Sequence, residues 1–228
     1  MVQTDFQIPR QAATLRTQVE DRLRSAILSG HFEASQRLVE RELCELFGVG
    51  RTSVREALRQ LEAEGLVTTV PHKGPTVSKV DYEDAEQIYA VRALLEGYAG
   101  EEFARHGSSE EMERLSLAVA HFEEAARANN PKELLAAKDE FYTVLLSGCG
   151  NVFITQMLNL LHNRVNLLRS TSMMQPGRLA KSVAEIREIH DAIKMRDAAK
   201  AGAACRHHVE MAARTILAHL RTKVSGSV

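Results

Sequence analysis

The sequence predicts a mainly α-helical protein built in two parts. In the first part, three stretches with helical spacing of apolar residues are followed by two short β-rich runs, 66–70 and 76–80. After Val80, every periodic stretch has the spacing of a helix and no further β-rich run appears. A length of 228 residues leaves room for one large hydrophobic core or two smaller ones, and we expect two domains. The predicted fold is therefore a winged helix-turn-helix domain followed by an all-α bundle of six helices.

The first two helices are predicted from their apolar spacing. Over 14–29 the apolar positions are Leu15, Val19, Leu23, Ala26 and Ile27. Gly30 supplies the stop signal that commonly follows a helix. A shorter helix is expected over 40–47, with Leu43, Leu46 and Phe47 facing inward. The stretch "FGVG" then turns the chain into a third helix.

The third helix begins near Arg51 and is expected to end at Gly65. Its buried face is formed by Val54, Ala57, Leu58 and Leu61. The two β-rich runs that follow are separated by "PHKGP", which holds the Pro and Gly typical of a hairpin turn. Three helices and a hairpin in this order complete the winged helix-turn-helix.

Six helices are predicted in the second part, separated by "HGSS", "NNP", "SGCGN" and "QPG". Their ranges are about 82–106, 109–129, 131–147, 151–170, 178–196 and 197–222. The predicted organisation is a polar tail over 1–13, the winged domain over 14–80 and the helical domain over 81–223. A hinge between the two domains is expected near 79–84.

Composition excludes some classes of protein. The formal net charge is only -1, with 11 Lys and Arg against 10 Asp and Glu in residues 1–80, so bulk charge does not indicate a nucleic-acid partner. The three cysteines, Cys44, Cys149 and Cys205, have neither disulfide nor metal-ligand spacing, which fits a reducing cytoplasm. We expect no membrane association, because no apolar run is long enough to span a bilayer and the first residues lack the apolar core of a secretion signal.

A basic strip on the third helix is the main functional feature of the first part. Arg51, Arg55 and Arg59 are four residues apart, which places them on one side of a helix. One interpretation is a solvated face on which Arg55 pairs with Glu62 or Arg59 with Glu56. The other is DNA binding, because the second helix of a helix-turn-helix enters the major groove with its N-terminal residues facing the base edges.

Residues with suitable donors lie at each expected DNA contact, which favours the second interpretation. Arg51, Thr52, Ser53 and Arg55 stand at the start of the third helix. The fork of an arginine can hold guanine O6 and N7 together, and hydroxyl groups bind phosphates or bases. Arg37 and Arg41 are expected to reach the DNA backbone, and His72 and Lys73 at the hairpin tip to contact phosphate or the minor groove.

The segment "QRLVERELCELFGVGRTSVREALRQLEAEGLV", with "HKG" in the hairpin, resembles the DNA-binding domain of the GntR family of bacterial transcription regulators. The helical remainder resembles the FCD effector domain of the FadR subfamily. This resemblance implies a homodimer that binds a palindromic operator, usually as a repressor, and responds to a small metabolite. By resemblance, Arg41, Arg51 and Arg55 contact DNA, and the tip that includes Gly74 is the wing. Gly50 and Ser53 depart from the family's usual Ser and Pro.

In the effector domain, this sequence departs from the residues that the resembled family usually has. Many FCD domains hold a divalent metal ion with an Asp, a His four residues later and two further His residues. Here Lys138 stands at the Asp position, Tyr142 and Ile186 at the first two His positions, and only His208 matches. An ammonium and an aliphatic side chain offer no lone pair to a metal, so we expect no metal and no other cofactor. A displaced site using Asp139, His190 and His207 is the alternative.

Three cations lie within apolar stripes of the predicted helical domain: Arg92, Lys138 and Arg164. A buried cation is costly unless it is paired, so each requires an anion. Internal pairing is one solution, for example between Arg92 and Glu96. We favour an anionic, carboxylate-type metabolite, which by resemblance would lie where the family binds its effector. The predicted effector-binding residues are Arg92, Lys138, Tyr142, Arg164 and His208.

An enzymatic function is not expected. No arrangement of nucleophile and base, and no phosphate-binding glycine loop, is recognisable in the sequence. The two rivals to a metabolite-responsive regulator are a metal-dependent sensor with displaced ligands and an enzyme whose winged domain only tethers it to DNA.

Overall fold

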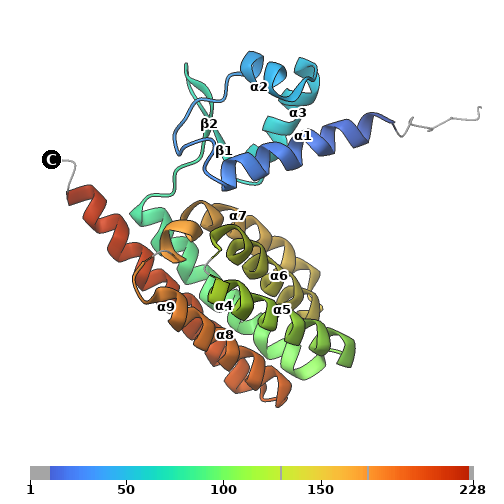
Figure 1. Cartoon of the computed structure of the whole chain (residues 1–228), viewed down its shortest axis with the longest axis vertical. Helices are drawn as coiled ribbons and strands as arrows, with labels where there is room; N and C mark the ends of the chain where they lie inside the picture. Colours follow the sequence, from blue (N-terminus) through green and yellow to red (C-terminus); the bar gives the residue numbers. More distant parts are fainter. Residues whose placement is uncertain (1–10, 129, 174, 226–228) are drawn as a thin grey trace, which may run out of the picture. The chain divides into compact units, whose positions relative to one another are not determined.

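The computed structural model describes residues 11–128, 130–173 and 175–225. Most of the predicted polar tail, residues 1–10, lies outside these ranges. The chain divides into two compact units, Met1–Lys79 and Val80–Val228, which are described separately (Figure 1). Within the described residues, none of the helices has the length and apolarity needed to cross a membrane.

The N-terminal unit contains three helices and a two-stranded hairpin (Figure 1). The helices are α1 (Gln11–Leu28), α2 (Glu40–Phe47) and α3 (Arg51–Ala63), and the strands are β1 (Val67–Val70) and β2 (Gly74–Val77). Apolar positions of all three helices are buried, among them Val19, Leu23, Leu43, Val54 and Leu61. The hydrophobic face of each helix therefore packs inward, and this leaves the polar face of α3 toward solvent.

The turn between α2 and α3 depends on a glycine. Gly48 follows α2 in the left-handed conformation, with φ of 65°, which a residue without Cβ adopts at little cost. The amide of Val49 then donates to the carbonyl oxygen of Cys44 at 3.2 Å and closes the turn. Gly50 precedes α3 in an extended conformation. This sharp turn places α3 across α2 as in a helix-turn-helix.

The hairpin is shifted from its predicted position. Val67 pairs with Val77 and Val70 with Gly74, so the second strand begins at Gly74 rather than at residue 76 and the tip is 71–73. The difference arises because the segment before α2 also pairs with β2. The amide of Leu38 donates to the Pro75 carbonyl at 2.9 Å, and Val77 donates to the Gln36 carbonyl at 2.9 Å. These bonds hold the hairpin against the start of α2.

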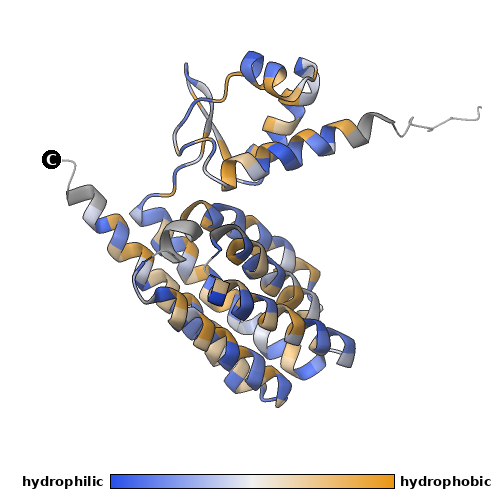
Figure 2. Ribbon diagram, in the orientation of Figure 1, coloured by the Kyte–Doolittle hydropathy of each residue, from blue (hydrophilic) through white to orange (hydrophobic). Residues whose placement is uncertain are grey.

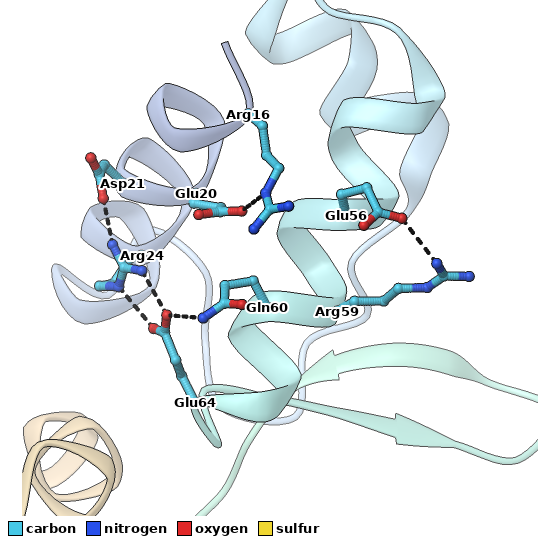
Figure 3. Close-up of polar contacts among 8 residues, drawn as sticks. All are labelled: Arg16, Glu20, Asp21, Arg24, Glu56, Arg59, Gln60 and Glu64. Carbon is cyan, nitrogen blue, oxygen red and sulfur yellow. Dashed lines mark hydrogen bonds and ion pairs between the residues drawn. The ribbon is translucent and has the colours of Figure 1, made fainter. Parts of the chain in front are cut away.

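A polar cluster fixes α1 to the end of α3 (Figure 3). The guanidinium of Arg24 donates to both carboxylate oxygens of Glu64, at 3.0 Å through Nε and 2.9 Å through Nη2. Gln60 donates to the same carboxylate at 3.0 Å, and Asp21 accepts from Arg24 at 2.6 Å. A bidentate Arg and carboxylate pair is geometrically specific. The C-terminal end of α3 is therefore held by α1, at the end opposite to the exposed Arg51.

The second unit consists of helices over the described residues. They are α4 (Tyr82–His106), α5 (Ser109–Ala128), α6 (Pro131–Cys149), α7 (Val152–Met173), α8 (Arg178–Lys194) and α9 (Ala198–Ser225). Figure 2 shows apolar and polar residues alternating along them, as expected for helices that each bury one face. Phe103, Phe122 and Phe141 lie in the largest core cluster. The predicted fold class, a winged helix-turn-helix followed by an all-helical domain, is confirmed.

Close packing of α4 on α9 brings the polar residues of the two helices into one interior. A Cβ atom added to Gly100 of α4 would lie 2.6 Å from Sγ of Cys205 on α9, which is closer than such contacts allow. Glycine at this position therefore permits the short separation. Arg92 of α4 and His208 of α9, both predicted effector-binding residues, are consequently buried in the same unit.

Candidate DNA interface and candidate ligand site

The N-terminal end of α3 is open to solvent. Arg51, Thr52 and Arg55 are exposed, and Ser53 is partly exposed. No side chain caps the start of the helix, because the residue before it is Gly50. The uncapped amides and the helix dipole favour an anion such as a phosphate at this end. The predicted base-reading residues are therefore accessible.

A shallow hollow of about 350 Å³ lies next to this helix end. It is lined by Arg37, Leu38, Val39, Glu40, Arg41, Arg51 and Pro75. Three of these are predicted DNA-binding residues, and they come from the segment before α2, from α2 and from α3. The structure thus brings Arg37, Arg41 and Arg51 around one concave surface, where three cations favour a polyanion.

The basic strip of α3 is partly paired within the protein. Arg55 donates through Nε to both carboxylate oxygens of Glu40, at 2.8 and 2.9 Å. Arg59 donates to Glu56 at 2.9 Å (Figure 3), the pairing that a solvated face would show. The proposed partner of Arg55 on a solvated face, Glu62, instead accepts a hydrogen bond from the backbone amide of Thr69 at 3.0 Å.

At the hairpin tip, His72 and Lys73 are exposed and Gly74 is partly exposed. His72 has a φ of 61° and Gly74 a φ of 82°. Nζ of Lys73 donates to the backbone carbonyl of Ser35 at 3.1 Å. This contact joins the side chain of Lys73 on the wing to the backbone of the segment that precedes α2.

The interior of the helical unit holds two sets of buried polar side chains. In the first, Arg92 donates through Nε to Glu96 at 2.8 Å and through Nη2 to the Tyr142 hydroxyl at 3.2 Å. Nε2 of His162 lies 3.0 Å from the same Glu96 carboxylate. Burial by itself raises the pKa of Glu96, but the charge of Arg92 and the hydrogen bond from His162 together outweigh burial, and the pKa falls to about 2. Internal pairing of Arg92 with Glu96, one of the two interpretations of this cation, is present.

The second set is a row of four side chains from three helices, Lys138, His208, Glu185 and Arg178, which we call the buried row. Nζ of Lys138 lies 2.9 Å from Nε2 of His208, and it also donates to the Ser182 hydroxyl at 2.9 Å. Nδ1 of His208 lies 2.6 Å from Glu185. Arg178 donates to both oxygens of Glu185, at 2.9 and 2.7 Å.

The partners of His208 define its protonation state. Burial, together with the charge of Lys138, lowers the pKa of His208 to about 4, so the ring is neutral at neutral pH. The Glu185 carboxylate can only accept, which assigns the ring proton to Nδ1. Nε2 then accepts from the Lys138 ammonium. The ammonium of Lys138 and the imidazole of His208 are therefore directly hydrogen-bonded in the interior.

Four of the five predicted effector-binding residues are buried side chains, namely Arg92, Lys138, Tyr142 and His208. The prediction that Arg164 points into the interior is wrong, because its side chain is exposed. Most of the apolar stripe that suggested burial is exposed too: Phe153 is 74%, Met157 57% and Leu160 44% exposed, whereas Leu168 packs against a core cluster. The inward face of α7 is formed instead by Leu158, His162 and Val165. Apolar spacing locates a face but does not say whether that face meets the core.

Sequence reasoning missed Arg178, Ser182, Glu185 and His162, although each is buried. Arg178 and Glu185 are seven residues apart, and this two-turn spacing on one helix was the available signal for a pair. His162 and Val165 share the buried face of α7, but only a structure shows that the contact of His162 is Glu96 on another helix.

The displaced metal ligands considered for the sequence do not converge. His207 and Asp139 are exposed, and His190 contacts Ser116 at 2.9 Å and Asp191 at 3.1 Å. Within the described ranges, no three His, Cys, Asp or Glu side chains are grouped so that they could hold a metal ion.

Comparison with known families gives the decisive observation. The FCD domain family matches residues 87–211, and the gntR family of bacterial regulatory proteins matches residues 15–77. The chain belongs to the GntR family. Its combination of a GntR domain with an FCD domain is consistent with the FadR subfamily.

Individual relatives agree with this assignment. The GntR family regulator is 29% identical over 200 residues to the HTH-type transcriptional repressor GlaR of Escherichia coli, covering 82% of this chain and 89% of that protein. It is 30% identical over 128 residues to an HTH-type regulator from the TAR-I ttuE-ttuC' intergenic region of Agrobacterium vitis, covering 55% of this chain and 75% of that protein. A crystal structure described as a GntR transcriptional regulator from Rhodococcus sp. RHA1 is 25% identical, with a TM-score of 0.78 over 90% of this chain and 98% of that one.

The family fixes the general activity. This GntR family regulator is a DNA-binding transcription regulator of the helix-turn-helix type, and it is not an enzyme. The exposed end of α3 and the hollow beside it form its candidate DNA interface, and the buried polar side chains of the helical unit form its candidate ligand site.

Proposed function

We propose that this regulator binds a palindromic operator as a homodimer and responds to a small carboxylate, bound beside Lys138 without a metal ion. The observation that carries this proposal is the ammonium of Lys138, 2.9 Å from His208 in the interior of the FCD domain. Repression is the expected outcome of operator binding, and the cytoplasm is the expected location because a bacterial transcription regulator acts where the DNA is.

Charge in the interior supports an anionic ligand. Among the described residues of the helical unit, the buried charged side chains are the cations Arg92, Lys138 and Arg178 and the carboxylates Glu96 and Glu185. A buried cation in a medium of low polarity favours a negative charge close to it, and a ligand carboxylate beside Lys138 would supply one. A ligand carboxylate would accept from Lys138 and take over the hydrogen bonds that Ser182 and His208 now receive.

An exposed apolar surface supports the dimer. Two helices that pack against each other, α4 and α7, carry large exposed apolar side chains. We call this surface the α4/α7 face, and its residues are Val91, Leu94, Tyr98, Phe153, Met157 and Leu160. Surfaces of this kind commonly mark protein interfaces. A second copy is the expected occupant, because one winged domain covers one half-site and a two-fold dimer matches a palindrome.

A direct path for coupling runs along α9. His208 of the buried row and Arg221 belong to this one continuous helix. Arg221 donates to the hydroxyl of Tyr82, the first residue of α4, at 2.7 Å, and its guanidinium lies 4.9 Å from the Tyr82 ring centroid. Ligand binding that shifts α9 would therefore act at the predicted hinge over 79–84. It would change operator affinity by the difference between its affinities for the two states.

Thermal unfolding in the presence of ligands tests the effector proposal. Purified protein is screened against mono- and dicarboxylates, with and without chelator, as wild type, Lys138→Met and Lys181→Ala. A ligand at one hundred times its dissociation constant stabilises by about 2.7 kcal/mol. We expect a shift that persists with chelator and in Lys181→Ala, which removes an exposed lysine, but is lost in Lys138→Met. A shift abolished by chelator would instead indicate the metal-dependent sensor.

Light scattering of variants tests the dimer. Leu94→Asp places a charge on the α4/α7 face and is expected to give monomers at micromolar concentration. Leu117→Asp is the matched control, because Leu117 of α5 is 64% exposed and Leu94 is 69% exposed. If Leu94→Asp remains dimeric with an unchanged dissociation constant, the dimer uses another surface.

A further inference from the structure

Glu40 is placed to control how Arg55 meets DNA. It is the first residue of α2, and Arg55 lies 15 residues later, on the first turns of α3. Nε of Arg55 donates to both oxygens of the Glu40 carboxylate, at 2.8 and 2.9 Å. The contact therefore crosses the turn of the helix-turn-helix and joins its two helices at the surface expected to face the major groove.

The pair of Arg59 and Glu56 is a useful contrast. Both residues belong to α3, three positions apart, and the hydrogen bond at 2.9 Å uses Nη1 of Arg59. Such a pair within one helix does not set the position of the guanidinium relative to α2. In Arg55 the hydrogen bonds use Nε. The edge of the planar guanidinium formed by Nη1 and Nη2 is then the one that can meet O6 and N7 of guanine in a bidentate contact.

Two physical effects of Glu40 then act in the same direction. A free arginine side chain loses rotamer entropy when it binds, and a guanidinium already held by a carboxylate loses less. The Glu40 carboxylate also repels phosphates, which weakens binding to every DNA sequence, whereas guanine offers acceptors that the oriented Arg55 can meet. The orientation of the Arg55 guanidinium favours binding to the correct base. The repulsion between the Glu40 carboxylate and phosphates disfavours binding through phosphate contacts alone.

The hollow beside α3 places Glu40 within the surface that is expected to meet DNA. Glu40 lines it together with Arg37, Arg41 and Arg51, so one carboxylate stands among three cations that are not its hydrogen-bonded partner. The side chain of Glu40 is 32% exposed and that of Arg55 56% exposed. Both are accessible to DNA, and neither is required for the core.

We propose that Glu40 is a positioning residue, which orients the guanidinium of Arg55 for a guanine and thereby sets the ratio of specific to non-specific DNA binding. The proposal rests on the predicted contact between Arg55 and a base, which is part of the proposed operator recognition. In this proposal Glu40 acts through Arg55 and does not itself contact a base.

The test compares two substitutions that each remove one negative charge from the same domain. Full-length wild type, Glu40→Gln, Glu56→Gln and Arg55→Ala each select binding sites from a pool of randomised DNA duplexes. Affinities are then measured for the selected site and for a scrambled duplex. Circular dichroism and thermal unfolding of each variant verify that the domain is folded. Both glutamine variants are expected to bind scrambled DNA more tightly, because both lose a repulsive charge.

The expected difference lies in specificity. Glu40→Gln is expected to lower the ratio of specific to non-specific affinity about tenfold and to relax the base preference that Arg55→Ala abolishes, since a bidentate contact discriminates by about 1 to 3 kcal/mol. Glu56→Gln is expected to keep the ratio within about twofold of wild type.

Three results would overturn the proposal. Equal ratios in Glu40→Gln and Glu56→Gln would mean that Glu40 acts only through its charge. A new preferred base in Glu40→Gln would mean that Glu40 itself contacts DNA. The third result is an unchanged base preference in Arg55→Ala, which would mean that Arg55 does not contact a base. If wild type still selects a palindromic site in that experiment, the proposal that a dimer binds an operator is unaffected.

Discussion

The two units of the chain hold positive charge in opposite ways. We compare three exposed cations of the N-terminal unit that line one hollow, Arg37, Arg41 and Arg51 (the exposed set), with the buried cations described in the helical unit, Arg92, Lys138 and Arg178 (the buried set). An exposed ion pair contributes about 0 to 1 kcal/mol, whereas removing one partner of a buried pair costs about 3 to 5 kcal/mol. Exposed cations therefore exchange water and counterions for a phosphate with little reorganisation. Buried cations accept a new anion only if it replaces hydrogen bonds that already exist.

Stability gives the largest expected contrast between the two sets. Arg92→Met leaves the buried Glu96 carboxylate without its cation and is expected to lower the free energy of unfolding by about 3 to 5 kcal/mol. Arg51→Met is expected to change it by less than about 0.5 kcal/mol, because the side chain is exposed. Urea denaturation measures both. Adding Glu96→Gln to Arg92→Met is expected to recover part of the loss, and equal stabilities for the two single variants would contradict the comparison.

The pH dependence of stability is the next expected effect. The pKa of His208 is lowered to about 4 by burial and by Lys138, from an ordinary value of 6.5. The unfolded chain therefore binds a proton that the folded chain excludes between these values, and stability present above pH 6.5 is lost as the pH falls toward 4. The loss from this group is of the order of 3 kcal/mol.

His208→Gln measures that loss directly. The amide of glutamine can accept from Lys138 and donate to Glu185 but does not titrate. Denaturation at pH 7 and at pH 5 is expected to show a smaller difference for His208→Gln than for wild type. His207→Gln is the control, since His207 is exposed and adjacent in sequence. The same pH profile for all three proteins would mean that His208 is not held neutral.

Operator affinity sharpens the description of the exposed set. If Arg51 reads a base, Arg51→Ala is expected to weaken binding to the selected site by about 1 to 3 kcal/mol and to relax specificity at one position. Arg59→Ala is the control, because Arg59 lies farther from the start of α3 than Arg51 and is hydrogen-bonded to Glu56. Fluorescence anisotropy on matched and mismatched duplexes measures both quantities. Equal losses in the two variants would mean that the strip contributes only charge.

The smallest effect is expected at the wing. Lys73→Ala is predicted to weaken binding to all sequences alike and to lower the slope of log affinity against log salt concentration by about one unit. Titrations at three or more salt concentrations give this slope. A sequence-dependent loss would instead indicate that the wing takes part in base recognition.

Sequence reasoning predicted the helices well because their ends carry strong local signals. Predicted and observed starts agree at Tyr82 and Arg178, where the chain leaves turn-forming residues. The second strand was placed two residues late. Its position depends on backbone hydrogen bonds to Gln36 and Leu38, almost forty residues earlier, and such pairing leaves no mark in the local pattern.

The candidate ligand site was predicted only in part, for a similar reason. Arg92 and Lys138 stood out because a cation in an apolar stripe is unusual. Arg164 had the same signal, yet it is exposed, as is most of its stripe. Spacing cannot distinguish a face that meets the core from a face that meets another protein. The contact of His208 with Glu185 joins two helices and therefore required a structure.

The pairing of β2 with the segment before α2 bears on how regulators of this kind diversify. Leu38 and Val77 are joined to their partners by backbone groups, at 2.9 Å in each case. Backbone hydrogen bonds of this kind do not depend on the side chain, as long as the donor residue is not proline. Substitution of the residues that face DNA can therefore alter which bases are preferred, while the spacing between the wing and the recognition helix is inherited unchanged. If the proposed operator binding holds, a lineage can in this way change the bases it prefers without changing the length of DNA that one domain covers.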